Sequence, residues 1–157
     1  VGTNIRKEFT EYEPEEIQKV FETNLFSAIA MTRLCFEFLE NGQDASVVNV
    51  SSVAASVDVA SGTPYGMTKA AELQFTRNLA VEWAKYGIRV NAVAPGPVAT
   101  DLFLHGKSEE QIQNFAKMAP LERLGQPEDI ARVVSFLVGP DSAWVNGQIL
   151  RANGGLV

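Results

Sequence analysis

The apolar residues of this chain fall into long stretches with helical spacing, separated by short apolar runs. The longest stretch begins at Pro14, and its apolar residues recur at every third or fourth position as far as Leu39, interrupted mainly by Asn24. This spacing predicts a helix of about six turns with one apolar face. Pro14 at its start and Asn41-Gly42 at its end are typical helix boundaries.

Three further helices are predicted from similar signals. A long helix is expected over 64–86, because Pro64 stands at its start and Gly87 follows its end. A capping-box pattern predicts a short helix over 108–118. A proline in the first turn predicts another over 128–138.

Three short apolar segments between these helices are predicted to be strands. The segment 46–50 is rich in β-branched residues, and we expect it to be buried on both faces. The segments 89–94 and 147–151 are the other two strands. Strands that alternate with helices favour an α/β fold with a doubly wound parallel sheet. Because a sheet of only three interior-like strands leaves one flank uncovered, we expect the chain to be the second half of a larger fold.

Composition narrows the function classes. The chain has 13 Lys+Arg against 19 Asp+Glu and a formal net charge of -6, which argues against nucleic acid and membrane surfaces as partners. Cys35 is the sole cysteine, so no internal disulfide can form, and a buried thiol in a reducing compartment is expected. His105 is the sole histidine, and we expect no metal site.

The location predicted from the sequence is cytoplasmic. No apolar stretch reaches the roughly 18 residues that span a bilayer. Residues 1–20 are too rich in charge for a secretory signal peptide. An organelle matrix stays open as a second location, because the chain begins at Val1 rather than at an initiator methionine, and a targeting segment can precede it.

The most informative chemical pattern is Tyr65-Gly66-Met67-Thr68-Lys69, at the start of the second long helix. A spacing of four residues places Tyr65 and Lys69 on one helical face. A nearby ammonium favours the phenolate form of a tyrosine, so Tyr65 can exchange a proton with a carbonyl or alcohol oxygen. Taken alone, the pattern is weak evidence, because it is more often that of a tyrosine at the protein boundary beside a solvated lysine.

Other polar residues can join this site. Ser52 follows the predicted strand 46–50 at its carboxyl end, where open α/β sheets bind ligands, although it can also simply cap a loop. Asn24 can make an ordinary hydrogen bond between helices, or hold a water that relays protons to Lys69. The turn 95–100 follows the second strand and can bind a polar ring substituent or merely reverse the chain.

Taken together and in this order, these motifs resemble the short-chain dehydrogenase/reductase family. The likeness extends over essentially all 157 residues. It rests on Asn24, Ser51-Ser52, Tyr65-x-x-x-Lys69, Arg89 to Gly96, Pro120 to Asp129, Val145 to Gln148 and Asn153-Gly154-Gly155. Within the family, the segments 2–7 and 79–84 are most similar to the tropinone-reductase-like branch.

The resemblance implies a Rossmann-type fold and an oxidoreductase that uses NADP or NAD. Its reaction is hydride transfer between the nicotinamide and a carbonyl or secondary alcohol of a small molecule. Tyr65 would be the general acid/base, Lys69 would favour its phenolate and hold the nicotinamide ribose, Ser52 would orient the substrate, and Asn24 would hold a relay water. The cofactor-binding residues implied by the resemblance are Tyr65, Lys69, Pro95, Gly96, Val98 and Thr100.

The resemblance also implies contacts of the two long helices. As in the family, these helices would pair subunits into a dimer or tetramer, with Trp83 either at that contact or in the core. Residues 101–119 would include a flap over the substrate, although packing of its apolar side chains on the protein is an equal interpretation.

The chain also departs from the family pattern. Ala55 and Asn153 stand where glycine and aspartate are usual, and no glycine-rich phosphate-binding turn follows a strand. We therefore expect residues 1–157 to be the carboxyl-terminal, substrate-side part of a single domain, without the part that binds the dinucleotide phosphates. The isolated chain is expected to be inactive. The alternative is a non-catalytic, shortened paralogue that acts as an interaction partner.

Overall fold

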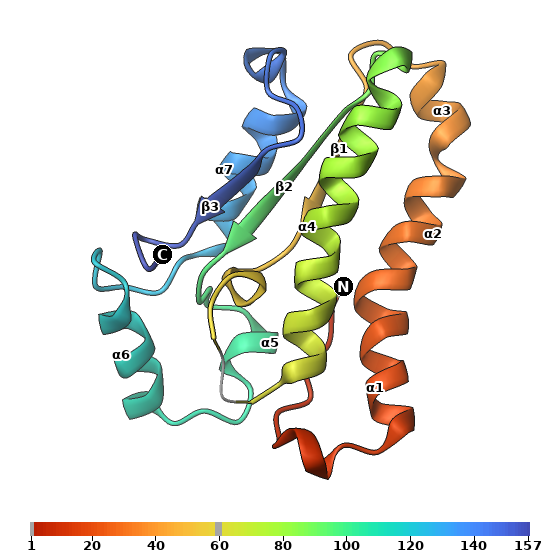
Figure 1. Ribbon diagram of the computed structural model, residues 1–157. Coiled ribbons are helices and arrows are strands. Elements are labelled where there is room, and N and C mark those ends of the chain that lie inside the picture. The colour runs from red at the N-terminus through yellow and green to blue at the C-terminus, as the bar shows by residue number, and fades with distance from the viewer. Residues whose placement is uncertain (1, 59–60) are drawn as a thin grey trace.

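Three parallel strands in the order β1-β2-β3 form the sheet. They are β1 (Ser46–Val50), β2 (Arg89–Pro95) and β3 (Ile149–Ala152), as Figure 1 shows. The computed structural model describes residues 2–58 and 61–157, so Val1 and part of the loop after β1 lie outside it. The predicted α/β fold with about three strands and flanking helices is confirmed.

The central strand β2 carries most of the buried sheet residues. Its side chains from Val90 to Ala94 are all buried, whereas those of β3 are half-buried or exposed. The expectation that β1 is buried on both faces is wrong, because Val50 is 51% exposed and only Asn49 is fully buried. The reason is that α7 (Pro127–Val138) contacts β1 on one face, whereas α4 (Thr63–Trp83) on the other face packs mainly against β2.

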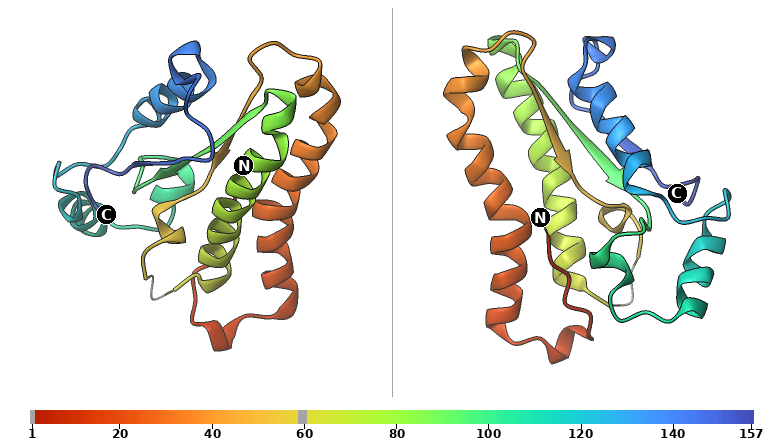
Figure 2. Two further views of the ribbon diagram at one scale, coloured as in Figure 1. Left: turned by 45° about the horizontal axis from the view of Figure 1, so that its top comes forward. Right: turned by 180° about the vertical axis from the view of Figure 1, so that it is seen from behind.

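Two helices cover the two faces of the sheet. The long helix α4 (Thr63–Trp83) packs against β2 on one face, and α7 (Pro127–Val138) lies on the other face, as Figures 1 and 2 show. Between α4 and β2 lies a core of Leu79, Ala80, Ile88 and Val90. The predicted helix over 64–86 ends as a 3₁₀ turn, Ala84–Tyr86, followed by Gly87 at φ +73°.

The first predicted helix is a column of several segments. It consists of α1 (Pro14–Phe21), a π-helical segment (Glu22–Phe26), α2 (Ser27–Leu34) and α3 (Phe36–Glu40). In the π segment, the N–H of Ser27 donates to the carbonyl of Glu22 five residues back. The column extends alongside α4 rather than across the sheet (Figure 1). The prediction had the correct extent but not the π turn or the break at Cys35.

The remaining elements lie near the carboxyl ends of the strands. They are α5 (Asp101–Leu104), which the sequence did not predict, and α6 (Glu109–Met118), which begins with the expected capping box of Ser108 and Gln111. Short 3₁₀ turns occur at Phe9–Glu11, Val53–Ala55 and Pro140–Ser142. Among the helices of the described residues, none combines the length and apolar character needed to cross a bilayer.

Candidate active site

The sheet brings the ends of distant segments to one edge. β1 and β2 are parallel, with Val50 opposite Val93, and β2 pairs in the same sense with β3, with Pro95 opposite Ala152. The carboxyl ends of all three strands therefore lie along the same edge of the sheet, called here its carboxyl edge. Ser51 and Ser52 follow β1 directly, and the turn 96–100 follows β2. In open parallel sheets this carboxyl edge is where ligands bind.

The first turns of α4 present Tyr65 and Lys69 at this edge. The two residues lie one helical turn apart on the same face, and the Lys69 Nζ is 5.9 Å from the centroid of the Tyr65 ring. Tyr65 is half-buried, whereas only 6% of Lys69 is exposed. The ammonium is held by two acceptors, because its Nζ donates to the Val50 carbonyl at 2.9 Å and to Glu72 Oε2 at 2.9 Å.

Two hydroxyl groups bond to the main chain of this part of α4, one from the segment after β1 and one from within the helix. The Ser51 Oγ donates to the main-chain carbonyl of Lys69 at 2.8 Å, and the Thr68 Oγ1 donates to the carbonyl of Tyr65 at 2.8 Å. Ser51 and Thr68 are both buried, so these hydrogen bonds are shielded from water. The position of the Lys69 side chain is thus fixed at its main chain as well as at its Nζ.

Asn24 connects three separate segments. Its Oδ1 accepts from the N–H of Thr3 at 2.8 Å, and its Nδ2 donates to the carbonyl of Thr3 at 2.8 Å. The same Nδ2 is 3.3 Å from the Thr68 Oγ1 on α4. Asn24 is 3% exposed and lies in the π-helical segment. The structure therefore shows a satisfied amide next to Lys69, linking the column, α4 and the amino-terminal segment.

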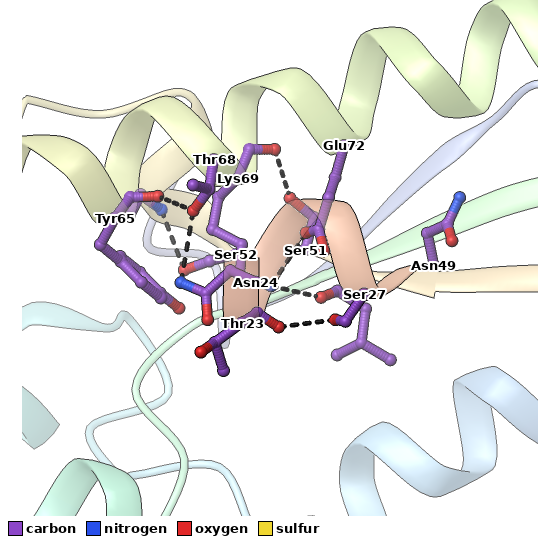
Figure 3. A network of polar contacts seen from close by, with 12 residues as sticks. Thr23, Asn24, Ser27, Asn49, Ser51, Ser52, Tyr65, Thr68, Lys69 and Glu72 are labelled. Carbon is purple, nitrogen blue, oxygen red and sulfur yellow. Dashed lines mark hydrogen bonds and ion pairs between the residues drawn. The ribbon is translucent and has the colours of Figure 1, made fainter. Parts of the chain in front are cut away.

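Ser52 lies in the same cluster. Its Oγ accepts from the N–H of Ala54 at 3.1 Å, so it caps the 3₁₀ turn as the simpler interpretation of the sequence proposed. A hydroxyl that accepts one hydrogen bond still has its proton to donate. Figure 3 shows Ser52, Asn24, Tyr65 and Lys69 gathered around the first turns of α4.

The turn after β2 has its own geometry. The N–H of Gly96 donates to the carbonyl of Ala152, and a Cβ on Gly96 would lie 2.9 Å from that of Asn153, so glycine allows β3 to approach here. Val98 forms a parallel bridge with Gly125. The bridge uses the carbonyl of Pro97 and the N–H of Ala99, so the N–H of Val98 points away from Gly125.

Thr100 ends this turn as the N-cap of α5. Its Oγ1 accepts from the N–H of Phe103, the third residue of the helix. Farther along, the Phe103 and Phe115 rings meet edge to face with centroids 5.2 Å apart, so α5 and α6 pack on each other. Among the described residues, no group of three or more His, Cys, Asp or Glu side chains is arranged to hold a metal ion.

Glu72 is a residue of this cluster that was not predicted from the sequence. This residue is 3% exposed, and burial raises the pKa of its carboxyl, while the nearby Lys69 ammonium acts in the opposite direction. The signal was present in the sequence, because residues 65, 69 and 72 share one helical face. An acidic residue in a helix is usually solvated, however, and only the structure shows that this face is buried.

Comparison with known proteins decides the family. A profile of the short-chain dehydrogenase/reductase family, described as Enoyl-(Acyl carrier protein) reductase, matches residues 1–157. This chain belongs to that family. The short-chain dehydrogenase/reductase family is one of oxidoreductases, and the resemblance stated from the sequence motifs is thereby confirmed.

Individual relatives agree with the tropinone-reductase-like assignment within the short-chain dehydrogenase/reductase family. A tropinone reductase homolog of Arabidopsis thaliana is 41% identical over 156 residues, which are 99% of this chain and 59% of the relative. NADPH-dependent aldehyde reductase 1 of the same plant is 40% identical over 148 residues, covering 94% of this chain and 51% of that protein.

A solved structure has a very similar fold. The gluconate 5-dehydrogenase of Burkholderia cenocepacia, crystallised in complex with NADP and tartrate, superposes with a TM-score of 0.93 at 26% identity. The match covers 99% of this chain and 62% of that one. The chain thus spans between about half and three fifths of the lengths of these short-chain dehydrogenases/reductases.

Proposed function

We propose that this chain is the substrate-side part of an NAD(P)-dependent oxidoreductase acting on a carbonyl group or a secondary alcohol of a small molecule. The observation that carries the proposal is the pairing of Tyr65 with the buried Lys69 ammonium, 5.9 Å from its ring, at the carboxyl edge of the sheet. A phenol beside a cation, at an edge where ligands bind, is suited to proton exchange with an oxygen atom.

In this proposal, Tyr65 moves the proton. In the reduction direction its hydroxyl donates to the carbonyl oxygen as the substrate carbon receives a hydride, and in the oxidation direction its phenolate takes the proton of the alcohol. The Lys69 ammonium stabilises the phenolate through its positive charge. Ser52 donates its free hydroxyl proton to the same substrate oxygen and so orients the substrate.

The group that supplies the hydride is a nicotinamide nucleotide, NADP or NAD. The donors present fit it: Lys69 uses two of its three N–H bonds within the protein, and the N–H of Val98 points away from its bridge partner. We assign its nicotinamide end to Tyr65, Lys69, Pro95, Gly96, Val98 and Thr100. Two relatives support a nicotinamide nucleotide as the cofactor, because one is named for NADPH and the other was crystallised with NADP. The Asn24 Oδ1 accepts one hydrogen bond, from the N–H of Thr3, and its remaining lone pair would hold a water that passes protons from Lys69.

We further propose that the phosphate-binding part of the domain lies outside residues 1–157. A dinucleotide derives much of its affinity from its pyrophosphate and adenosine ends, and binding energy at those ends positions the reacting atoms. Titration of the 157-residue chain with NADPH and with NADH, followed by nicotinamide fluorescence, is expected to show no saturation at micromolar concentrations. Micromolar binding would contradict this division of the domain.

The activity is tested in a chimera. Residues 1–157 replace the matching part of the Arabidopsis tropinone reductase homolog, whose remaining residues complete the domain. Consumption of NADPH and NADH is then measured against a panel of aldehydes and ketones, with the chimera carrying Tyr65→Phe as the matched control. Carbonyl-dependent consumption that disappears in the control is the expected result. A well-folded chimera with no carbonyl-dependent activity would reject the proposal.

A second function is supported by the outer face of the helical column. Leu34 and Phe38 are 73% and 80% exposed, and a groove of about 840 Å³ between the column and α4 is lined by apolar rings, among them Phe36 and Trp83. Exposed apolar surface of this kind marks contact sites. We propose that this face pairs copies of the chain into a dimer or tetramer, or pairs it with longer relatives as a non-catalytic partner.

The proposed compartment is based on the net charge of the chain and on its cysteine. A net charge of -6 and a single free cysteine suit a reducing aqueous compartment, and we propose the cytoplasm or an organelle matrix. The presence of the chain in a soluble cytosolic or matrix fraction tests this. Recovery in a membrane fraction after a high-salt wash would contradict it.

A further inference from the structure

A buried ion pair lies directly behind the proposed proton donor. The Lys69 Nζ and Glu72 Oε2 are 2.9 Å apart, and their side chains are 8% and 4% exposed. Figure 3 shows Glu72 reaching back along α4 toward Lys69, on the side away from Tyr65. Nothing in the proposed proton transfer uses Glu72.

Such a pair needs a reason other than stability. Removing two charges from water costs about as much as their attraction returns, so a buried ion pair rarely stabilises a fold better than apolar residues would. An ammonium buried without a counter-ion tends to lose its proton. A carboxylate hydrogen-bonded to the ammonium at 2.9 Å opposes that loss.

The geometry also limits where the ammonium can point. An ammonium has three N–H bonds, and the Val50 carbonyl and Glu72 Oε2 accept two of them at 2.9 Å each. The third N–H bond is left to point toward the side on which Tyr65 lies, with the Nζ 5.9 Å from the centroid of the ring. Because the two acceptors lie on different elements, β1 and α4, they fix the position of the Nζ from two sides.

We propose that Glu72 is a positioning residue of this site, whose buried carboxylate keeps Lys69 protonated and aims its remaining N–H bond toward Tyr65 and the cofactor. This role of Glu72 adds to the proposed function and rests on it, because positioning Lys69 matters only if Tyr65 transfers a proton. The interaction itself, between Glu72 and Lys69, exists independently of any reaction, and it can be measured without cofactor or substrate.

The surroundings of Glu72 contain few other charges. Burial raises the pKa of its carboxyl, and the charge and hydrogen bond of Lys69 act the other way. The polar side chains packed around the pair from β1 and from the π-helical segment are neutral: Asn49, Ser51 and Asn24. Among the described residues, Tyr65 is the other titratable group near the ammonium. Protonation of the pair is therefore set mainly by its two members.

The first experiment uses the 157-residue chain and the variant Glu72→Gln, which keeps the shape and a hydrogen-bond acceptor but removes the charge. The pH at which Lys69 loses its proton is followed by NMR of the lysine side-chain nitrogens. We expect this midpoint to fall by about one pH unit or more in the variant, which is a loss of about tenfold in proton affinity. Glu82→Gln, an equal charge change at an exposed position of α4, is the matched control and is expected to leave it unchanged.

Two outcomes would overturn the proposal. One is the same Lys69 midpoint in Glu72→Gln as in Glu82→Gln. The other is a Lys69 midpoint that falls as far in Glu72→Asp as in Glu72→Gln. A carboxylate in nearly the same place should restore most of the protonation of Lys69. A merely structural role of Glu72 would change the free energy of unfolding without moving the midpoint.

A second measurement needs no variant and therefore does not depend on the folding of Glu72→Gln. In the unaltered chain, the carboxyl carbon of Glu72 and the nitrogen of Lys69 are followed together as the pH is lowered. Because the carboxylate lies 2.9 Å from the ammonium, the Lys69 nitrogen signal is expected to shift at the same midpoint at which the Glu72 carboxyl takes up its proton. Independent shifts would overturn the proposal. Because neither measurement involves turnover, an inactive chimera would reject the proposed function and leave this result standing.

Discussion

At the scale of single residues, the site is built by side chains that bond to the main chain. The Ser51 Oγ holds the carbonyl of Lys69, and the Val50 carbonyl holds its Nζ, so the lysine is fixed at both ends. Tyr65 and Lys69 could be predicted from the sequence because their spacing of four is a property of one helix. The partners Val50 and Ser51 could not, because they reach Lys69 only through the packing of α4 against the sheet.

The phenol of Tyr65 is expected to carry the proton transfer. In the active chimera, Tyr65→Phe removes the hydroxyl while keeping the ring, and turnover should fall by about 10²- to 10⁴-fold, as is usual on loss of a general acid/base. Steady-state kinetics gives the activity, and circular dichroism checks the fold. Tyr86→Phe, which changes an equivalent ring at the far end of α4, serves as the control. A Tyr65→Phe variant with more than a tenth of the parent activity would be incompatible with this role.

The pair of Arg123 and Asp129 gives a pH-dependent contribution to stability. Hydrogen bonds from the Arg123 side chain and the Gln126 N–H lower the pKa of Asp129 from 3.8 to about 2. Because the folded-state pKa lies below the unfolded-state value, the contribution is present above pH 4 and is lost as the pH falls toward 2.

The stabilities of Asp129→Asn and of the parent chain are expected to become similar at low pH. Urea unfolding at neutral pH should show the variant less stable than the parent, and this difference should shrink between pH 4 and pH 2. The effect should be small, because the pair is exposed to solvent. Glu128→Gln in the same helical turn is the control. A difference that is constant over this pH range would show that the charge of Asp129 is not its source.

At the scale of whole elements, local signals predicted the helices and distant contacts modified them. Prolines and capping boxes placed α6 and α7 correctly, because caps depend on residues a few positions away. The π turn around Asn24 was not predictable, since the partner of its amide is Thr3, twenty-one residues earlier. The burial of β1 was predicted wrongly for a similar reason: the composition of a strand does not show which of its faces the helices cover.

The Asn24 amide is expected to fasten the helical column to its neighbours. Asn24→Ala leaves the N–H and carbonyl of Thr3 without their partners, and unpaired polar groups in a buried place cost about 1–3 kcal/mol. Chemical unfolding in urea measures the loss. Asn41→Ala, which removes one exposed hydrogen bond at the end of α3, should cost less than about 0.5 kcal/mol. Equal losses in both variants would show that Asn24 makes no special contribution.

At the scale of the molecule, the parallel order of the strands assembles the site. The sequence predicted that Ser52 and the turn 95–100 follow strand ends, and parallel pairing then places both at one edge. It did not predict that the segment around Thr3 would reach Asn24, because such a contact depends on how the column packs against α4. Local chemistry was therefore readable in advance, whereas the connections between segments were not.

The exposed apolar face of the helical column is expected to hold copies of the chain together. The double variant Leu34→Glu with Phe38→Glu places charges on this face, and sedimentation velocity should show a dimer or tetramer in the parent and a monomer in the variant. The free energy of unfolding of each subunit should change little, because both side chains are already exposed. Leu121→Glu, at an exposed apolar position far from the column, is the control. A parent that sediments as a monomer would contradict the expectation.

The outer edge of β1 determines how a further strand can add to this molecule. Alternate N–H and carbonyl groups of β1 point away from β2 and can accept another strand, in cis or from a second chain. A strand added in the parallel sense would end beside Ser51, so the residues that follow it would arrive next to Tyr65. One added in the antiparallel sense would end at the opposite side, near Ser46. The direction of the incoming strand alone therefore selects which of its flanking loops meets the reactive phenol.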